Sequence, residues 1–159
     1  MNMKICDTTK ICFAASSGGH LTEISRLSGV MENRNYFLIT ESSDFHDNAF
    51  TDNIYYVSQI NRKQPTFIPR FIKLFFQCRS IIKKENADCI ITTGALMGYA
   101  AALAGKLLRK KVIYIESFAR IDTASLTGRL IYPIADLFIV QWEEGKVFFP
   151  KSVYGGPIL

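Results

Sequence analysis

The fold of this chain follows from the stretch Ile11-Cys12-Phe13-Ala14-Ala15-Ser16-Ser17-Gly18-Gly19-His20. Its first five residues are an apolar run typical of a buried strand, and its two glycines permit a tight turn. Beyond the turn, apolar residues recur at the spacing of one helix face, namely Leu21, Ile24, Leu27 and Met31. A glycine turn between a strand and a helix directs backbone N–H groups and the positive end of the helix dipole at one point. The stretch therefore predicts an anion site, with His20 placed to meet a phosphate.

The rest of the chain repeats this alternation of strand and helix. Further strands are predicted at Tyr36–Thr40, Ile54–Val57, Asp88–Thr92, Lys111–Glu116 and Leu137–Val140. Helices are predicted over Phe67–Lys84, Ala95–Leu108 and Thr127–Ala135, the last capped by Ser125 and distorted or ended by Pro133. Residues Glu41–Asp52 are polar and fit a loop or a short helix. This alternation predicts an α/β fold, a parallel sheet with helices on both faces.

Three polar groups follow strands of the predicted sheet: Ser16–His20, Thr92–Gly94 and Glu116–Arg120. Ligands of such sheets bind beyond the carboxyl ends of the strands. We therefore expect these three groups to converge on one site.

Length and composition limit the function. The 159 residues, 48% of them hydrophobic, suit one folded domain and argue against disorder. The net charge of +5 fits anionic membranes or phosphorylated substrates and is too small to indicate nucleic-acid binding. The four cysteines form no C-x-x-C pair, and three of them lie in apolar patterns typical of buried free thiols in a reducing cytoplasm: Cys12, Cys78 and Cys89.

Neither a signal peptide nor a membrane-spanning helix is expected. Residues Met1–Lys10 are too polar for a signal peptide, and no stretch reaches the ~20 apolar residues that a spanning helix needs. The helix over Phe67–Lys84, however, has an apolar arc wider than packing on a sheet requires, and cations flank that arc. We interpret it as a contact with a membrane surface or a partner, made by Phe67, Phe71, Leu74 and Phe75. The alternative is a helix held between the sheet and a neighbouring element.

Several side chains at the predicted site have more than one interpretation. His20 is a neutral phosphate donor, a general base for a hydroxyl, or a residue of the helix cap. Glu116 binds sugar hydroxyls or acts in proton transfer, or it is a structural partner of Arg120 or Arg129. Glu23 complements the helix dipole. Glu41 resembles the ribose-binding acid of nicotinamide enzymes, but the chain lacks their G-x-G-x-x-G spacing and the Lys-Ser/Thr of a P-loop.

Five sequence blocks occur in a fixed order: Ser17-Gly18-Gly19-His20, Thr92-Thr93-Gly94-Ala95, Ile115-Glu116-Ser117, Ser125-Leu126-Thr127-Gly128-Arg129 and Gln141-Trp142. With these blocks the chain resembles, from Lys10 to Gly156, the membrane-associated subunit of the split UDP-N-acetylglucosamine transferase of dolichol-linked oligosaccharide synthesis. It is also similar to bacterial counterparts from capsule and exopolysaccharide clusters. The single-chain peptidoglycan N-acetylglucosaminyl transferase has a similar glycine-glycine-histidine loop.

The resemblance implies a single Rossmann-like domain over residues 1–159, the N-terminal, acceptor-side half of a GT-B glycosyltransferase. In that class the N-terminal domain faces a lipid-diphosphate acceptor and the C-terminal domain binds the UDP-sugar. The chain stops at Leu159, about where the second domain would begin. A separate catalytic subunit is therefore expected to bind the UDP-sugar in a heterodimer, and this chain is expected to be a hexosyltransferase only within that complex.

The resemblance also implies roles for individual residues. Contact with the diphosphate or the acceptor sugar is expected from Ser17, Gly18, Gly19, Thr93, Gly94, Ser117 and Arg120. His20 and Glu116 are the candidates for activating or orienting the acceptor hydroxyl, and no metal or cofactor is expected. The eukaryotic relatives carry an N-terminal transmembrane anchor, which Met1–Lys10 cannot be. We therefore expect peripheral attachment at the cytoplasmic face of the plasma membrane, through the helix over Phe67–Lys84.

Two other functions fit the sequence less well. One is a structural recruiter with a degenerate pocket, which only anchors and activates the catalytic partner. The other is a stand-alone nucleotide-binding enzyme of the Rossmann type. Binding of the acceptor lipid by this chain alone separates the first alternative from the main hypothesis.

Overall fold

In the computed structural model, which describes residues 8–41 and 53–158, seven strands form one parallel sheet. All six predicted strands are present, and a two-residue strand is added at the end: β1 (Ile11–Ala15), β2 (Tyr36–Glu41), β3 (Ile54–Val57), β4 (Cys89–Thr92), β5 (Lys111–Ile115), β6 (Leu137–Val140) and β7 (Val153–Tyr154). Glu41, the first residue of the predicted loop over Glu41–Asp52, is instead the last residue of β2. The remaining residues of that loop, 42–52, lie outside the described part of the chain.

The strand order β3-β2-β1-β4-β5-β6-β7 reverses direction between β1 and β4. The chain first builds outward from β1 through β2 to β3, and then returns to place β4 on the other side of β1. This is a topological switch point, where the connections leave the two strands in opposite directions and a crevice forms beyond their carboxyl ends. The loop Ser16–His20 and the loop Thr93–Gly94 lie at this crevice.

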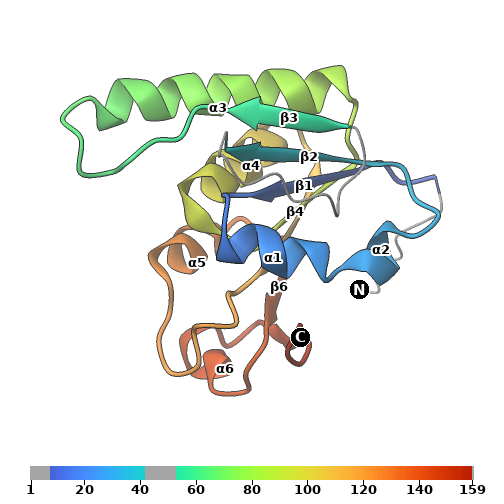
Figure 1. Cartoon of the computed structure of the whole chain (residues 1–159). Coiled ribbons are helices and arrows are strands. Elements are labelled where there is room, and N and C mark those ends of the chain that lie inside the picture. The colour runs from blue at the N-terminus through green and yellow to red at the C-terminus, as the bar shows by residue number, and fades with distance from the viewer. Residues whose placement is uncertain (1–7, 42–52, 159) are drawn as a thin grey trace.

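Helices cover both faces of the sheet, as predicted. They are α1 (Gly19–Ser25), α2 (Ser28–Met31), α3 (Phe67–Lys84), α4 (Ala95–Leu107), α5 (Leu126–Ile131) and α6 (Gly145–Phe148). Figure 1 shows α3 along the strands β3 and β2, and α1 and α2 beyond β1 on the other side.

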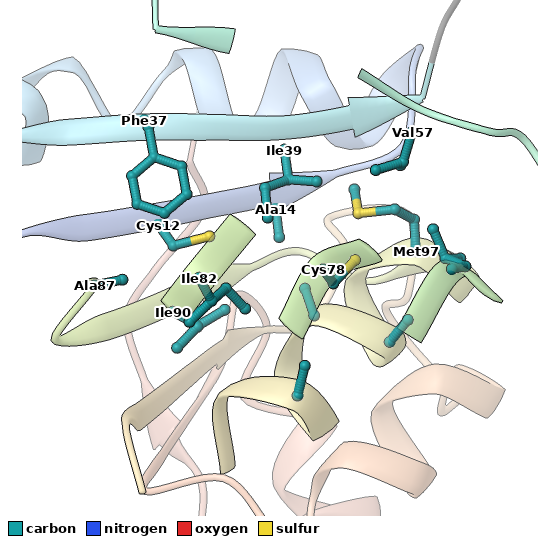
Figure 2. Close-up of a cluster of buried hydrophobic side chains, with 14 of the residues drawn as sticks. Cys12, Ala14, Phe37, Ile39, Val57, Cys78, Ile82, Ala87, Ile90 and Met97 are labelled. Carbon is teal, nitrogen blue, oxygen red and sulfur yellow. The ribbon is translucent and has the colours of Figure 1, made fainter. Parts of the chain in front are cut away.

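Alternate residues of each strand enter different cores because successive side chains point to opposite faces. Cys12 and Ala14 of β1 join Phe37 and Ile39 of β2 under α3 and α4, as Figure 2 shows. The opposite face of β1 carries Ile11, Phe13 and Ala15, which pack against α1 and α2. The three cysteines predicted to be buried thiols are buried and free, and burial raises the pKa of Cys78 and Cys89 to about 12. These thiols therefore stay protonated and serve as core residues.

Two predicted helices end differently in the structure. The apolar face over Leu21–Met31 is divided between α1 and α2, because the Ser25 hydroxyl bonds back to the Thr22 carbonyl at 2.8 Å and Leu27 leaves the helical ladder. The helix predicted over Thr127–Ala135 is only α5, which ends at Ile131 before Pro133. Its predicted cap is confirmed, since Ser125 Oγ accepts the Gly128 N–H at 2.8 Å.

Helix α3 buries a narrower stripe than its sequence suggested. Leu74, Cys78 and Ile82 are buried under it, one turn apart on one face. The prediction that Leu74 contacts a membrane or a partner is therefore wrong, because only 1% of this residue is exposed. Phe67, Phe71 and Phe75, the other predicted contact residues, are half-buried and pack against the core beside that stripe.

The apolar residues that α3 does expose lie on its outer face. Ile68, Ile72 and Phe76 are 68%, 50% and 58% exposed and follow one another at intervals of four. None of the helices in the described part of the chain is long and apolar enough to cross a bilayer.

Candidate functional site

The loop after β1 presents bare backbone to solvent. Gly18 has φ 89° and ψ −141°, a conformation that favours glycine, and α1 starts at the next residue. A Cβ on Gly18 or Gly19 would meet no described atom within 4 Å, so a ligand can approach both residues closely. Ser17 lies half-buried at the start of this turn.

The loop after β4 is fastened to His20. The Thr93 hydroxyl donates to the His20 carbonyl at 3.1 Å, and Gly94 takes a φ of 120°. A Cβ at Gly94 would lie 3.1 Å from Tyr114 Oη, which is a tight contact, and 3.5 Å from His20 Cε1, so this φ and the Tyr114 hydroxyl both favour glycine. The predicted convergence of the two loops is confirmed. Thr93 itself is fully buried and holds the loops together, so its hydroxyl does not face a ligand as predicted.

Glu23 joins His20 to the loop after β5. Its Oε1 accepts the Ser117 hydroxyl at 2.9 Å and the Phe118 N–H at 2.7 Å. Its Oε2 lies 3.6 Å from His20 Nδ1, and both of these buried atoms lack a hydrogen-bond partner among the described residues. From the sequence, Glu23 was expected only to complement the helix dipole. Its spacing of three residues from His20 on one helix was the signal that the two side chains meet.

Glu116 is held within the protein. Only 3% of the residue is exposed, and its Oε1 accepts hydrogen bonds from Tyr114 Oη at 3.2 Å and from the Ser117 N–H at 3.0 Å. Its Oε2 accepts the Ser125 N–H at 3.3 Å and the Ser125 hydroxyl at 3.0 Å. Burial and the charge of Glu116 raise the pKa of Tyr114, which keeps its hydroxyl a donor. The structure thus gives Glu116 the task of tying β5 to the start of α5, and its catalytic role stays a prediction.

The third predicted group is only partly assembled at the site. Ser117 is joined to the site by the hydrogen bond from its hydroxyl to Glu23. Arg120 is exposed instead, and its Nη1 donates to Thr123 Oγ1 at 3.4 Å. Trp142 fixes this loop, because its indole N–H donates to the Phe118 carbonyl at 2.8 Å and the two rings lie 5.0 Å apart.

A hollow of about 500 Å³ lies beside these residues. We call it the His20 hollow, and it is lined by Gly19, His20, Thr22, Glu23, Arg26, Ser117, Phe118, Ala119 and Ile158. Arg26 adds a positive charge that the sequence analysis did not assign to the site. Among the residues described, no three His, Cys, Asp or Glu side chains lie close enough together to hold a metal ion.

Glu41 is a second carboxylate near His20. It is buried at the end of β2, and this burial raises its pKa, while the charge of His20 acts in the opposite direction. The titratable side chains that contact one another at the site are therefore one imidazole, His20, and one carboxylate, Glu23. Such a set can take a proton from a hydroxyl and stabilise the imidazolium that forms.

Known proteins match this chain in sequence. A profile of the family described as "Oligosaccharide biosynthesis protein Alg14 like" matches residues 11–158. The human UDP-N-acetylglucosamine transferase subunit ALG14 is 29% identical over 182 residues, which cover 96% of this chain and 84% of the human protein. The mouse protein of the same name is 30% identical over 188 residues, with the same two coverages.

Solved structures match it in fold. MurG from Acinetobacter baumannii superposes with a TM-score of 0.68 at 15% identity, over 84% of this chain and 41% of that protein. UDP-N-acetylglucosamine 2-epimerase from Rickettsia bellii superposes with a TM-score of 0.72 at 13% identity, over 95% and 43%. The chain thus spans less than half of either solved protein and has the fold of one Rossmann-like half of a GT-B-like enzyme.

The sequence match confirms the resemblance drawn from the five blocks, and the glycine loop, Thr92–Gly94 and Glu116 all lie at the carboxyl edge of the sheet. With a profile that covers residues 11–158 and relatives 29 and 30% identical, the chain belongs to the Alg14-like family of oligosaccharide biosynthesis proteins.

Proposed function

We propose that this chain is the acceptor-side subunit of a two-chain glycosyltransferase. It binds a polyprenyl-diphosphate-linked sugar and recruits a catalytic subunit that binds the UDP-sugar. The observation that carries the proposal is the meeting of His20, Gly94 and Glu23 at the switch point of a half GT-B fold. The names of the relatives, subunits of a UDP-N-acetylglucosamine transferase, support it.

In this proposal the glycine loop meets the diphosphate. Gly18 and Gly19 offer exposed backbone without side chains, and Arg26 in the His20 hollow supplies a positive charge. Ser17 and Ser117 add hydroxyl groups at the edges of the same site.

His20 is the proposed general base. It takes the proton of the acceptor hydroxyl while that oxygen attacks the anomeric carbon of the donor sugar and UDP leaves. The resemblance implies inversion at that carbon. The Glu23 carboxylate lies beside Nδ1 of the imidazole, at 3.6 Å, which leaves the other ring nitrogen for the substrate.

The finer parts of the proposal concern the biological setting. The product is a bacterial capsule or exopolysaccharide, and the heterodimer works at the cytoplasmic face of the plasma membrane. Attachment is peripheral, through the outer face of α3. That face combines Ile68, Ile72 and Phe76 with cations, and α3 as a whole carries five Lys or Arg and no Asp or Glu, namely Arg70, Lys73, Arg79, Lys83 and Lys84.

One observation favours a second candidate, a recruiter that does not take part in the chemistry. The buried Glu116 carboxylate accepts four hydrogen bonds, from Tyr114, Ser117 and Ser125, as expected of a structural residue. Binding of an acceptor lipid by this chain alone separates the two functions, because a recruiter has no acceptor site.

The deciding experiment compares the isolated chain with the pair. The purified chain is assayed with a UDP-sugar and a polyprenyl-diphosphate-linked sugar, alone and after co-expression with a UDP-sugar-binding subunit. We expect transfer only by the pair, and a loss of roughly 10²-fold or more in the pair carrying His20→Ala. Full turnover by the isolated chain would contradict the two-chain enzyme, and unchanged kinetics of His20→Ala would remove His20 from the mechanism.

A further inference from the structure

A second and larger concavity lies on the other side of Gly94. We call it the apolar groove; it has a volume of about 910 Å³, within the range of pockets that enclose small ligands. Three aromatic rings lie along it: the ring centroids of Phe67 and Phe71 are 6.0 Å apart with the rings tilted, and those of Phe71 and Tyr99 are 5.8 Å apart with the rings stacked. Leu126 and Leu130 of α5 complete it and are 58% and 43% exposed.

One end of the groove lies next to the candidate catalytic residue. Ala95 and Leu96 line it, and Ala95 directly follows Gly94, whose Cβ position is 3.5 Å from the His20 ring. A ligand with its head group at His20 can therefore extend into the groove along the start of α4.

The other side of the groove is formed by α3. Phe67 and Phe71 line the groove, and Ile68 and Ile72, the next residues along the helix, belong to the exposed outer face. Apolar surface is thus continuous from the start of α4, across the first turns of α3, to the face proposed to meet the membrane. In Figure 1 the loop after β3 and helix α5 lie on the same side of the molecule.

The charge of the residues that line the groove favours an anionic ligand over a cationic one. Of the described residues that line it, none is acidic, and Arg62 is positively charged. Its walls are helices and one loop, so it offers no strand edge to which an extended peptide could pair. Hydrocarbon attached to an anionic head group fits this combination better than a peptide does.

We propose that the apolar groove binds the first isoprene units of the acceptor lipid, while its diphosphate lies at the Gly18–His20 loop. This inference rests on the proposed function and adds to it the path of the lipid chain. The rings of Phe67, Phe71 and Tyr99 form the floor, Leu126 and Leu130 cover the chain, and the rest of the lipid leaves over α3 into the bilayer.

The test is calorimetric titration of the full chain with inorganic diphosphate and with geranyl, farnesyl and geranylgeranyl diphosphate, each below its critical micelle concentration. Because each buried methylene adds to the affinity, we expect Kd to fall at least about tenfold from the geranyl to the geranylgeranyl compound. The double variant Leu126→Gln/Leu130→Gln should lose this dependence on chain length and keep its affinity for inorganic diphosphate. The matched control is Leu107→Gln, which is 65% exposed at the end of α4 and lies outside the groove.

The outcomes separate the two proposals. If inorganic diphosphate and the prenyl diphosphates all fail to bind, the acceptor site of the proposed function is contradicted and the groove with it. If they bind with equal affinity, or if Leu126→Gln/Leu130→Gln keeps the chain-length dependence of the control, the groove alone is overturned. A photoreactive prenyl diphosphate gives an independent measurement on the wild-type chain. We expect its cross-links at residues 59–71, 95–99 and 126–130, and cross-links elsewhere would contradict the proposal.

Discussion

The Nδ1 atom of His20 lies 3.6 Å from the Oε2 atom of Glu23, just beyond the reach of a hydrogen bond, and both atoms are buried. The other oxygen of Glu23 is fixed by Ser117 and by the Phe118 N–H. Because the carboxylate cannot turn freely, its Oε2 stays beside the imidazole.

The first prediction follows from this pair. Glu23→Gln keeps the shape and the contact with Ser117 but removes the charge beside His20. We expect the kcat of the two-chain enzyme to fall by roughly 10²-fold, at the lower end of what a general base contributes. The control is Glu32→Gln, an exposed acid at the end of α2. An unchanged kcat would show that Glu23 only supports the loop.

The second prediction decides the role of Glu116. Glu116→Ala leaves the donors of Tyr114, Ser117 and Ser125 without their acceptor. The free energy of unfolding in urea should fall by about 2–4 kcal/mol, because several buried groups lose their partners at once. Glu143→Ala, at an exposed position after β6, serves as the control and should change it little. If Glu116→Gln abolishes transfer without loss of stability, Glu116 acts on the substrate instead.

The third prediction concerns α5, the helix that Ser125 caps. A Cβ at Gly128 would lie 2.3 Å from Glu116 Oε2 and 2.9 Å from Ser125 Oγ. Gly128→Ala should therefore lower the stability by about 1–3 kcal/mol through overpacking. Gly29→Ala in α2 meets no described atom within 4 Å and should stabilise the protein by up to about 1 kcal/mol, since alanine favours a helix. Equal melting temperatures for the two variants would contradict the close packing at Gly128.

The sequence predicted the strands well because buried parallel strands are continuous apolar runs. Ile11–Ala15 and Leu137–Val140 needed no partner information to be recognised. Strand β7 was missed because two residues, Val153 and Tyr154, are too few for any periodic signal. The helix predicted to run to Ala135 ends at Ile131 in the structure, because Pro133 cannot continue a helix.

The site was predictable only where it depends on strand ends. The loops with Gly18 and Gly94 were expected to meet because parallel strands end at one edge. Glu23 was missed because its partners, Ser117 and Phe118, lie more than ninety residues away and reach it only in the folded chain. The outward face of α3 was assigned wrongly at Leu74, since a wide apolar arc does not reveal which part of it packs on the sheet.

The fourth prediction concerns Glu41 and pH. Burial raises its pKa in the folded protein above the value in the unfolded chain. Folding therefore favours protonated Glu41. Its contribution to the free energy of unfolding is present below the pKa that Glu41 has in the unfolded chain, and it is lost as the pH rises through the pKa that Glu41 has in the folded protein. Glu41→Gln removes that loss, so the variant should be more stable than the wild type at neutral pH, with the difference vanishing toward pH 4. Thermal unfolding of both proteins between pH 4 and 8 measures this, and a wild type that gains stability relative to Glu41→Gln with rising pH would contradict it.

The last prediction concerns the outer face of α3. Replacing Ile68, Ile72 and Phe76 by serine removes apolar side chains that are half or more exposed, so the core under Leu74 is left intact. Sedimentation with anionic liposomes should weaken by roughly 10²-fold, given the area that the three side chains would bury in the interface. Added salt should weaken the wild type as well, because the cations of α3 contribute to attraction. Val147→Ser, at an apolar position of α6 that is 79% exposed, tests whether any exposed apolar residue has this effect. A triple variant that sediments like Val147→Ser would place the membrane contact elsewhere on the chain, and a wild type that stays in the supernatant would contradict peripheral attachment through α3.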